Sequence, residues 1–535
     1  MHRLRRARRT LAAVGIAATL ALLAACTGTT DDNPDDQTLL IGIESEPDVL
    51  DPNVGGGWIT WRIYGLMYES LVQQDLLTPS SEASVPEIQP ALAETWEVSD
   101  DGLTYTFHLR EGVTFSDGTP FDAAAVEYNI RRVWDESAPQ YSAAAAGPGA
   151  YIWSRLSDVE VVDDLTVVFR MSSPFSPFLR LLAEGYHIGM ISPTALEEYG
   201  NEGIADHPTG TGPFTFVERV RGQYIKLARN DDYWGRNSEL TGVTFVPLPD
   251  ASARVAALRN GEVDVIAVPD PDSVDNLRDE GFSISDGTPP HVWYLSFNMK
   301  NQYTAIKEVR QAINLAIDRQ GMADELLQGT ADPAYDIQSP ANAAYVERLD
   351  AYERDVDRAR ELLASVGLED GFEVTLATST DGSGQIIPVP MAEYIQQNLA
   401  EVGIDVTIDA SEWISYLGTY AQGFPDEVGM AQMSWGMTTP YWLDIILNSE
   451  NAPPGSNVGY YANAELDALM AKAISSPDED EANALWVQAM EIATEDAAIA
   501  PIVNDRAPYV LAPHVNGWVS ASEERFDLTF VTIEG

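Results

Sequence analysis

Alternating hydrophobic and polar positions predict a series of β-strands in the first half of the chain. Leu103–Arg110 alternates along its length, and Val159–Met171 does so on both sides of an Asp-Asp turn, which predicts a hairpin. An uninterrupted apolar run at Thr38–Ile43 predicts a buried strand. Three further strands are expected at Phe214–Val220, Tyr224–Arg229 and Val243–Leu248.

Apolar residues at helical spacing lie between these strands, together with signals for helix ends. A capping Asp122 begins one expected helix, and a glycine directly follows two others. In the second half, a strand at Phe372–Ala377, a helix at Pro388–Val402 and a strand at Ile404–Ile408 follow one another. This β-α-β order predicts an α/β fold with parallel strands. The other expected helices are Asp122–Val133, Ser252–Asn260, Ile306–Arg319 and Asp355–Val366.

The amino-terminal residues have the features of an export signal. Five arginines among the first nine residues precede an apolar stretch of about 15 residues, Leu11–Ala25. This stretch is shorter than the roughly 20 residues that a membrane-spanning helix needs, which argues against an uncleaved anchor helix. Arg8-Arg9 is also similar to a twin-arginine signal, so both export routes stay open.

Cys26 is the only cysteine of the chain, so no disulfide can form within it. The sequence Leu-Ala-Ala-Cys at 23–26 resembles the lipobox of bacterial lipoproteins, in which the cysteine is lipidated and becomes the first residue. The acyl chains would hold the protein on the membrane surface. We therefore predict a signal peptide at 1–25, lipidation of Cys26 and a polar, acidic tether at 26–36.

Acidic residues dominate the composition. The chain has 83 Asp and Glu against 31 Lys and Arg, a net charge of −52, and removal of residues 1–25 with their five arginines changes it to −57. This charge argues against nucleic acid, whose phosphates need clustered Lys and Arg. It also argues against a second, electrostatic attachment to anionic lipid. A solvated acidic surface that keeps the chain soluble is preferred to an adaptation to salt or to cationic substrates.

Short motifs follow one another along nearly the whole chain after residue 37. The densest block, at 91–118, contains ALAETW, DGLTYTF, LREGV and FSDG. Together with the other motifs, in the same order, it resembles the signature of family 5 extracellular solute-binding proteins, the receptors for oligopeptides, dipeptides, nickel and some oligosaccharides. Most motif residues are turn formers or apolar strand positions, so they identify the fold rather than the ligand. The other motifs are Asp51-Pro52, YESL at 68–71, GTGPF at 210–214, LARN at 227–230, Tyr233-Trp234, LRNGEVD at 258–264, LSFN at 295–298, VRQAINLAIDR at 309–319, ARELLASVG at 359–367 and LAEVGIDV at 399–406.

The resemblance implies an α/β, two-lobed periplasmic-binding-protein-like fold of type II, in the large class with an extra inserted domain and a hinge between the lobes. One lobe would combine residues 37–63, 205–288 and 505–535, with the inserted domain at 64–204. The other lobe would be 289–504. Closure needs no chemistry, because a ligand that contacts both lobes shifts the equilibrium toward the closed state.

Three stretches are candidates for ligand contact. The loop at 53–61 has three glycines and two tryptophans, and in the family this stretch lines the cleft. The segment 435–442 has three aromatic side chains that suit stacking on a sugar. The strand 295–298 ends where the lobes should meet, and we group it with the aromatic residues at 413 and 416. Each aromatic side chain could instead belong to the core. The predicted ligand-binding residues are Gly57, Trp58, Trp61, Asn298, Trp413, Trp435, Tyr441 and Trp442.

One position departs from the family's pattern. The resemblance implies that peptide-binding members carry an aspartate before a proline in the segment after the tryptophan, and that its carboxylate pairs with the peptide's α-amino group. Here Thr439 stands before Pro440, and the only acid close by in the sequence is Asp444. A hydroxyl supplies only part of the counter-charge that a buried ammonium needs. We therefore keep oligopeptide and oligosaccharide as alternatives, and favour a neutral ligand or a peptide held by backbone and side chains.

Enzyme chemistry finds little support in the sequence. It has no G-x-S-x-G or H-E-x-x-H motif, and its six histidines lie too far apart for metal-ligand spacing. We expect no catalytic residue, cofactor or metal, and keep a hydrolase built from paired acids as the least favoured alternative. A sensor or adhesion lipoprotein without a transport role would share every motif.

The prediction from the sequence is a lipid-anchored substrate-binding protein of an ABC importer. It would face the extracellular side of the cell membrane or the periplasm, act as a monomer, and deliver a peptide or oligosaccharide to a permease and ATPase complex.

Overall fold

The computed structural model describes residues 37–534 apart from 83, 289, 383–385, 507 and 524. The predicted signal peptide, Cys26 and the tether at 26–36 lie outside the described residues. Thr38–Glu534 forms one compact unit. Within the described part, no helix is both long and apolar enough to cross a bilayer.

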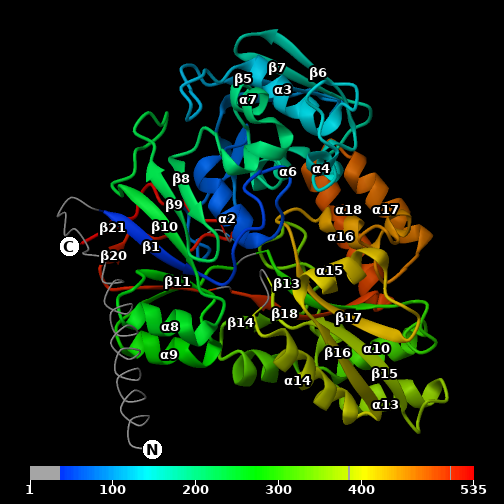
Figure 1. Ribbon diagram of the computed structural model, residues 1–535. Coiled ribbons are helices and arrows are strands. Elements are labelled where there is room, and N and C mark those ends of the chain that lie inside the picture. The colour runs from blue at the N-terminus through cyan, green and yellow to red at the C-terminus, as the bar shows by residue number, and fades with distance from the viewer. Residues whose placement is uncertain are drawn as a thin grey trace, which may run out of the picture. The chain divides into compact units, whose positions relative to one another are not determined.

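A seven-stranded sheet contains strands from both ends of the described chain, in the order β12-β19-β11-β1-β10-β9-β8. The central β1 pairs in parallel with β10 and β11, and its alternate residues Leu39, Ile41 and Ile43 are buried, which explains the apolar run there. Helices α8 and α9 pack against strands of this sheet (Figure 1). The elements are β1 Thr38–Ile43, α2 Trp58–Met67, β8 Phe214–Val220, β9 Tyr224–Arg229, β10 Gly242–Pro247, α8 Ala251–Arg259, β11 Val265–Ala267, α9 Pro271–Asp279, β12 Ser283–Ser285 and β19 Tyr509–Leu511.

A four-stranded antiparallel sheet, in the order β4-β5-β7-β6, follows α2 in the chain. Its strands β6 and β7 confirm the predicted hairpin, and the alternating burial of β5 confirms the period-two pattern. Helix α3 begins after Asp122, whose side chain accepts a hydrogen bond from the backbone N–H of Ala125. The elements are β2 Val72–Gln74, β3 Ile88–Pro90, β4 Ala93–Val98, β5 Thr104–Leu109, α3 Ala123–Trp134, α4 Ala143–Ala146, α5 Ala150–Trp153, β6 Leu156–Asp163, β7 Thr166–Met171, α6 Phe178–Glu184 and α7 Pro193–Gly203.

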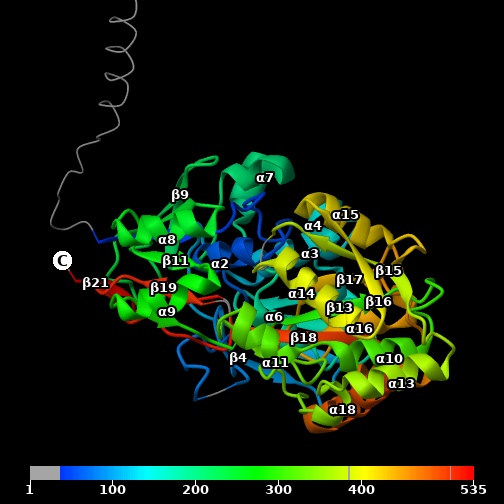
Figure 2. The ribbon, with the colours of Figure 1, turned by 90° about the horizontal axis from the view of Figure 1, so that it is seen from below.

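A six-stranded sheet has the order β14-β18-β13-β17-β15-β16. Strands β15 and β16 are parallel with α14 between them in the chain, which confirms the predicted β-α-β unit. The late strand β18, red in Figures 1 and 2, lies beside β13, whose six residues are all buried. The elements are β13 Val292–Phe297, α10 Lys307–Ala316, α11 Arg319–Gly321, β14 Ala331–Pro333, α12 Leu349–Tyr352, α13 Val356–Ser365, β15 Phe372–Ser379, α14 Pro388–Ala400, β16 Ile404–Ser411, α15 Trp413–Gln422, β17 Val428–Trp435, α16 Trp442–Leu447, α17 Ala464–Ser475, α18 Glu479–Glu495 and β18 Ile499–Asp505.

The helix predicted at Ile306–Arg319 is shorter than expected. Helix α10 ends at Ala316, and the side chain of Asp318 accepts a hydrogen bond from the backbone N–H of Gly321, which caps the short helix α11. Arg319 is buried and donates to the carbonyl oxygen of Pro501 at 2.7 Å. The predicted C-terminal end of this helix was therefore wrong, because the cap at Asp318 and the burial of Arg319 end the helix earlier than the periodicity indicates.

The chain passes between the two large sheets twice, from β12 to β13 and from β18 to β19. Each of the two large sheets takes its strands from the segments predicted for one lobe. The boundaries of the lobes and the hinge between them remain predictions. The largest buried core does not stop at these boundaries. It joins residues of 71–190, among them Phe178, to residues of 292–499, among them Trp442.

Candidate ligand-binding site

Glu184 is a buried carboxylate that lies between distant segments of the chain. It ends α6 and is 1 % exposed. Its Oε1 accepts hydrogen bonds from the backbone N–H of Thr438 at 2.8 Å, from the hydroxyl of Thr438 at 2.8 Å and from the backbone N–H of Thr439 at 3.3 Å. Its Oε2 is also buried and has no partner among the residues that the structure describes. One oxygen is therefore fixed by hydrogen bonds, and within the described part of the chain the other has none.

The environment of Glu184 changes its protonation. Burial raises the pKa of Glu184 to about 7, and the charge of Glu523 adds to this rise. The hydrogen bonds from Thr438 and the positive charge of Arg180 act against it. Near neutral pH the carboxyl group is thus about half protonated. A cation bound at Oε2 would restore the negative charge.

A chain of hydrogen bonds connects Glu184 to three other parts of the molecule. The amide of Gln74 in β2 donates to the hydroxyl oxygen of Thr438 at 2.7 Å. The Nη2 of Arg525 donates to the side-chain oxygen of Gln74 at 3.2 Å and to the carbonyl oxygen of Ala183 at 3.1 Å. Segments near residues 74, 184, 438 and 525 therefore meet at one polar cluster.

Aromatic rings surround this cluster. Tyr186 stacks on Trp61 with ring centroids 4.2 Å apart and meets Trp58 edge-on at 5.4 Å. Trp58 also lies 3.9 Å from the ring of His291, between centroids, and burial lowers the pKa of His291 to about 3, so this ring is neutral. Gly57 precedes α2 with φ 85°, a conformation that favours glycine. The structure thus brings the predicted residues Gly57, Trp58 and Trp61 next to the cluster.

Two predicted residues of the segment 435–442 lie in the hydrophobic core. Trp442 is 1 % exposed and its indole N–H donates to the side-chain oxygen of Gln338. Tyr441 is buried and meets Phe175 edge-on, with centroids 5.4 Å apart. Trp435 is half-buried and packs against the same core. The part of this segment that reaches the polar cluster is Thr438 and Thr439.

Asn298 and Trp413 have local partners. The Asn298 amide donates to the carbonyl oxygens of Pro425 and Val428 at 3.1 and 2.9 Å, so it fixes a turn. Trp413 begins α15, is half-buried and lies parallel to the ring of Tyr416 at 6.3 Å. Within the part of the chain that the structure describes, neither residue has a hydrogen bond or ring contact with the cluster around Glu184, and their role in binding remains a prediction.

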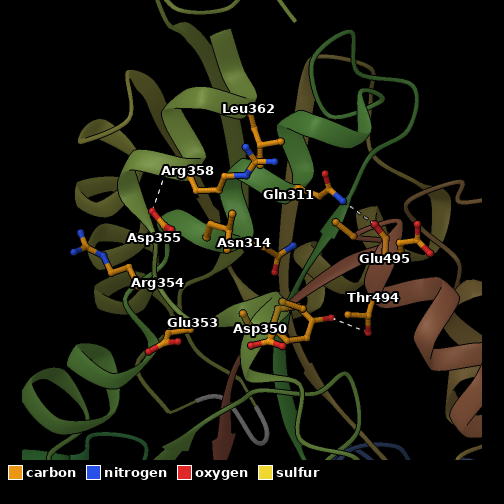
Figure 3. A pocket seen from close by; sticks show the side chains of 14 residues that line it. Gln311, Asn314, Asp350, Glu353, Arg354, Asp355, Arg358, Leu362, Thr494 and Glu495 are labelled. Carbon is orange, nitrogen blue, oxygen red and sulfur yellow. Dashed lines mark hydrogen bonds between the residues drawn. The ribbon is translucent and has the colours of Figure 1, made fainter. Parts of the chain in front are cut away.

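A larger hollow lies elsewhere, between α10, α12, α13 and the end of α18 (Figure 3). It has a volume of about 440 Å³. Its polar side chains bond to one another and to the backbone: Gln311 donates to the carbonyl oxygen of Glu495, and Tyr352 to the hydroxyl of Thr494. Asp355 caps α13. These groups already have partners, so the hollow is a weaker candidate than the cluster at Glu184.

Metal chemistry has no visible support. Within the part of the chain that the structure describes, no group of three or more His, Cys, Asp and Glu side chains could hold a metal ion.

Comparison with known proteins gives the family. A model of the bacterial extracellular solute-binding proteins, family 5, matches residues 87–453, which is more than half of the chain. The chain belongs to this family. Its members are binding proteins, so this solute-binding protein is not an enzyme.

Relatives match the family 5 protein over almost its full length. The glutathione-binding protein GsiB of Salmonella paratyphi A is 29% identical over 521 residues, which cover 95% of this chain and 96% of the relative. The periplasmic binding protein DppA from Helicobacter pylori, solved with the peptide STSA, has a TM-score of 0.81 at 28% identity and covers 94% of this chain and 99% of its own. The oligopeptide-binding protein AppA from Bacillus subtilis, solved with a nonapeptide, has a TM-score of 0.77 at 25% identity and covers 94% and 100%. The predicted periplasmic-binding-protein fold is confirmed.

In this solute-binding protein, the acid nearest to Thr439 in the sequence is not the acid that contacts it. Asp444, the nearest acid in sequence, accepts a hydrogen bond from Asn448 in the next turn of chain. The acid that contacts Thr439 is Glu184, 255 positions earlier. Its only signal in the sequence is an acid at the end of the segment 178–183, which is apolar except for Arg180, and Arg525 has no such signal.

Proposed function

We propose that this chain is the lipid-anchored solute-binding subunit of an ABC importer, and that it captures a small peptide-like ligand through the ligand's ammonium group. The proposal rests on the carboxylate of Glu184, of which Oε1 accepts hydrogen bonds and Oε2 has no partner among the described residues. A buried carboxylate without a cation is unfavourable, and an ammonium donor at Oε2 would supply both charge and hydrogen bond. The geometry also supports a role in closure, because Glu184 is the last residue of α6 while Thr438 and Thr439 follow β17 of the six-stranded sheet.

The relatives agree with a ligand of this kind. GsiB is described as glutathione-binding, and DppA and AppA were solved with peptides. Glutathione and unmodified peptides carry an α-ammonium group at neutral pH. DppA is also described as associated with an ABC transporter, which supports the importer role. We place the hinge at the two chain crossings, β12 to β13 and β18 to β19, and expect the protein to act as a monomer on the outer face of the membrane.

Calorimetry tests the ammonium requirement. The purified protein is titrated with Ala-Ala, Ala-Ala-Ala and glutathione, each also in its N-acetylated form, and with the neutral sugar maltotriose. We expect at least one free-amino compound to bind and its acetylated form to bind at least about 100-fold more weakly, because acetylation removes the charge that Glu184 would meet. Binding of maltotriose alone, or equal affinity for free and acetylated forms, would contradict the proposal. Uptake that persists after deletion of the cognate permease gene would contradict the importer role.

Replacement of Cys26 tests the lipid anchor. Cys26→Ala is expected to move the protein from the membrane fraction to the soluble fraction or the medium, because the acyl chains have no other attachment point. Immunoblots of fractionated cells measure this. Glu361→Gln, which changes an exposed residue paired with Arg358, is the control that keeps the wild-type distribution. Membrane retention of the Cys26→Ala protein at wild-type level would rule out anchoring at this residue.

A further inference from the structure

The hydrogen bonds that lead to Glu184 have a direction, and this direction is set at the far end of the chain of bonds. An arginine can only donate, so the side-chain atom of Gln74 that faces Nη2 of Arg525 at 3.2 Å must be its oxygen. The amide nitrogen of Gln74 therefore faces the hydroxyl oxygen of Thr438, at 2.7 Å. Arg525 thus fixes the orientation of the Gln74 amide.

The amide of Gln74 in turn fixes the proton of a hydroxyl group. An amide nitrogen only donates, so the hydroxyl oxygen of Thr438 accepts at this contact and its single proton must point elsewhere. The acceptor that this proton meets is Oε1 of Glu184, at 2.8 Å. The same oxygen accepts from the backbone N–H groups of Thr438 and Thr439. Three donors are therefore directed at Oε1.

These donors determine where a proton on Glu184 lies. A proton on Oε1 would face the hydroxyl group of Thr438, whose own proton would then lose its acceptor, and an unpaired buried donor is unfavourable. The other oxygen, Oε2, is buried and has no hydrogen-bond partner in the described part of the chain. The neutral acid therefore carries its proton on Oε2. This is the oxygen at which the ligand's ammonium group would bind, so binding releases that proton to the solvent.

Gln74 contributes an amide and no charge. Its side chain is 1 % exposed and ends β2, in the domain predicted at 64–204, whereas Thr438 belongs to the lobe predicted at 289–504. The bond between them would therefore form only when the lobes are closed. An apolar side chain of similar length at position 74 would fill the same space, but it would leave the hydroxyl group of Thr438 free to rotate.

Building on the proposed function, we infer that Gln74 is a positioning residue of the binding site. Held by Arg525, Gln74 turns the hydroxyl group of Thr438 toward Oε1 of Glu184, and so keeps Oε2 as the oxygen at which the proton and the ammonium group exchange. Without this amide, the hydroxyl group can turn and accept from a proton on Oε1, which stabilises the neutral acid.

Other charged and titratable groups also face Glu184. Burial raises its pKa, the charge of Glu523 adds to the rise, and Arg180 on the same helix acts against it. Tyr151 on α5 and Tyr186 lie close enough for the charge of Glu184 to raise their pKa further, but burial is the main cause in both, and both stay neutral near pH 7. A substitution at position 74 leaves all of these groups in place.

The number of protons released on binding measures the effect of Gln74. Calorimetry of Ala-Ala-Ala binding at pH 7, in two buffers of different ionisation enthalpy, gives this number. With the pKa of Glu184 at about 7, the wild-type protein should release about 0.5 proton per ligand. Gln74→Met should increase the release to about 0.75 proton, the value for a pKa that is higher by about half a unit.

Variants of Thr438 test whether Gln74 acts through the hydroxyl group. Thr438→Val removes this group at nearly constant shape and should increase the release at least as much as Gln74→Met. Thr438→Ser keeps a hydroxyl group and should release about 0.5 proton, as the wild type does. The double variant should release no more protons than Thr438→Val alone, because the hydroxyl group on which Gln74 acts is already absent. A role of Gln74 in folding alone would not give this pattern.

An exposed glutamine provides the matched control. Gln320 donates its amide to the carboxylate of Asp324 at 2.7 Å on the surface, and Gln320→Met should change neither the affinity nor the proton release. Thermal unfolding checks that each variant is folded. Gln74→Leu repeats the test with a second apolar side chain in case Gln74→Met does not fold.

The outcomes distinguish the inference from the function on which it rests. A release that stays at the wild-type value in the folded Gln74→Met protein would overturn the positioning role and leave the ammonium site standing. A further increase in the double variant would also overturn it, since Gln74 would then act on Glu184 without the hydroxyl group. Failure of Ala-Ala-Ala, Ala-Ala and glutathione to bind the wild-type protein, or binding without proton release at pH 7, would overturn the proposed ammonium site as well.

Discussion

Glu184→Gln is expected to weaken the binding of a free-amino ligand about 100-fold, which corresponds to about 3 kcal/mol. The substitution keeps the size of the side chain, and its carbonyl oxygen can still accept from Thr438 and Thr439. It removes only the negative charge that would face the ammonium. Calorimetry with the best-binding compound of the panel measures the loss.

The pH profile gives a second readout of the same carboxylate. Because the folded protein holds the pKa of Glu184 at about 7, binding below this pH must first remove a proton. Affinity should fall by about tenfold for each unit below pH 7, and it should fall again above about pH 8, where the α-ammonium group of the ligand loses its proton. Glu184→Gln should abolish the slope below pH 7. In the unfolded state the pKa of Glu184 is 4.5, which is lower than the value of about 7 in the folded protein. The unfolded state therefore loses this proton first, and the free energy of unfolding decreases as pH rises from 4.5 to 7. The variant should therefore be at least as stable as the wild type at pH 8.

An exposed glutamate provides the control. Glu361 pairs with Arg358 on the surface, and Glu361→Gln should change neither the affinity nor its pH dependence. If the Glu184→Gln protein binds as tightly as the wild type, the ammonium lies elsewhere.

The second large effect is on stability. Arg132→Met is expected to lower the free energy of unfolding by about 3–5 kcal/mol, because it leaves the buried carboxylate of Asp51 without its cation. Arg132 is 0% and Asp51 1% exposed, and the guanidinium also donates to the side-chain oxygen of Asn53 at 2.7 Å. These contacts fix the loop that leads to Gly57 and Trp58. Ligand affinity should therefore fall in parallel with stability.

Its neighbour on the same helix is a matched control. Arg131 is 29% exposed and pairs with Glu127 and Asp135 one turn away on each side. Arg131→Met should cost less than about 1 kcal/mol, since surface pairs contribute little. Equilibrium urea denaturation measures the free energy of unfolding of both variants. An equal decrease in the two would show that burial does not increase the contribution of the Arg132–Asp51 pair to stability.

Local patterns predicted most elements of the fold. The alternation at Leu103–Arg110 and the cap at Asp122 depend on residues a few positions apart, and each is confirmed. The misplaced end of the helix at 306–319 shows the limit, because the buried side chain of Arg319 bonds to Pro501, far along the chain.

The candidate site depends almost entirely on such distant contacts. The aromatic residues at 58 and 61 could be predicted as candidates because tryptophans beside glycines are conspicuous in the sequence, and their role in binding remains a prediction. Glu184 was missed because its partners lie 254 and 255 positions away and become neighbours only in the folded chain. Tyr441 and Trp442 were chosen for their aromatic rings, and a ring alone does not distinguish a cleft from a core.

The buried core that joins residues of 71–190 to residues of 292–499 has a consequence for the rates of ligand exchange. On the proposed hinge, opening would separate apolar surfaces such as those of Phe175 and Tyr441, which are in contact in the structure, and would expose them to water. With such a hinge, the unliganded protein would be closed for most of the time. Binding and dissociation of the ligand would both require a rare opening. A bound ligand would therefore stay bound long after the external concentration has fallen. Slow dissociation of the ligand is therefore accompanied by slow association.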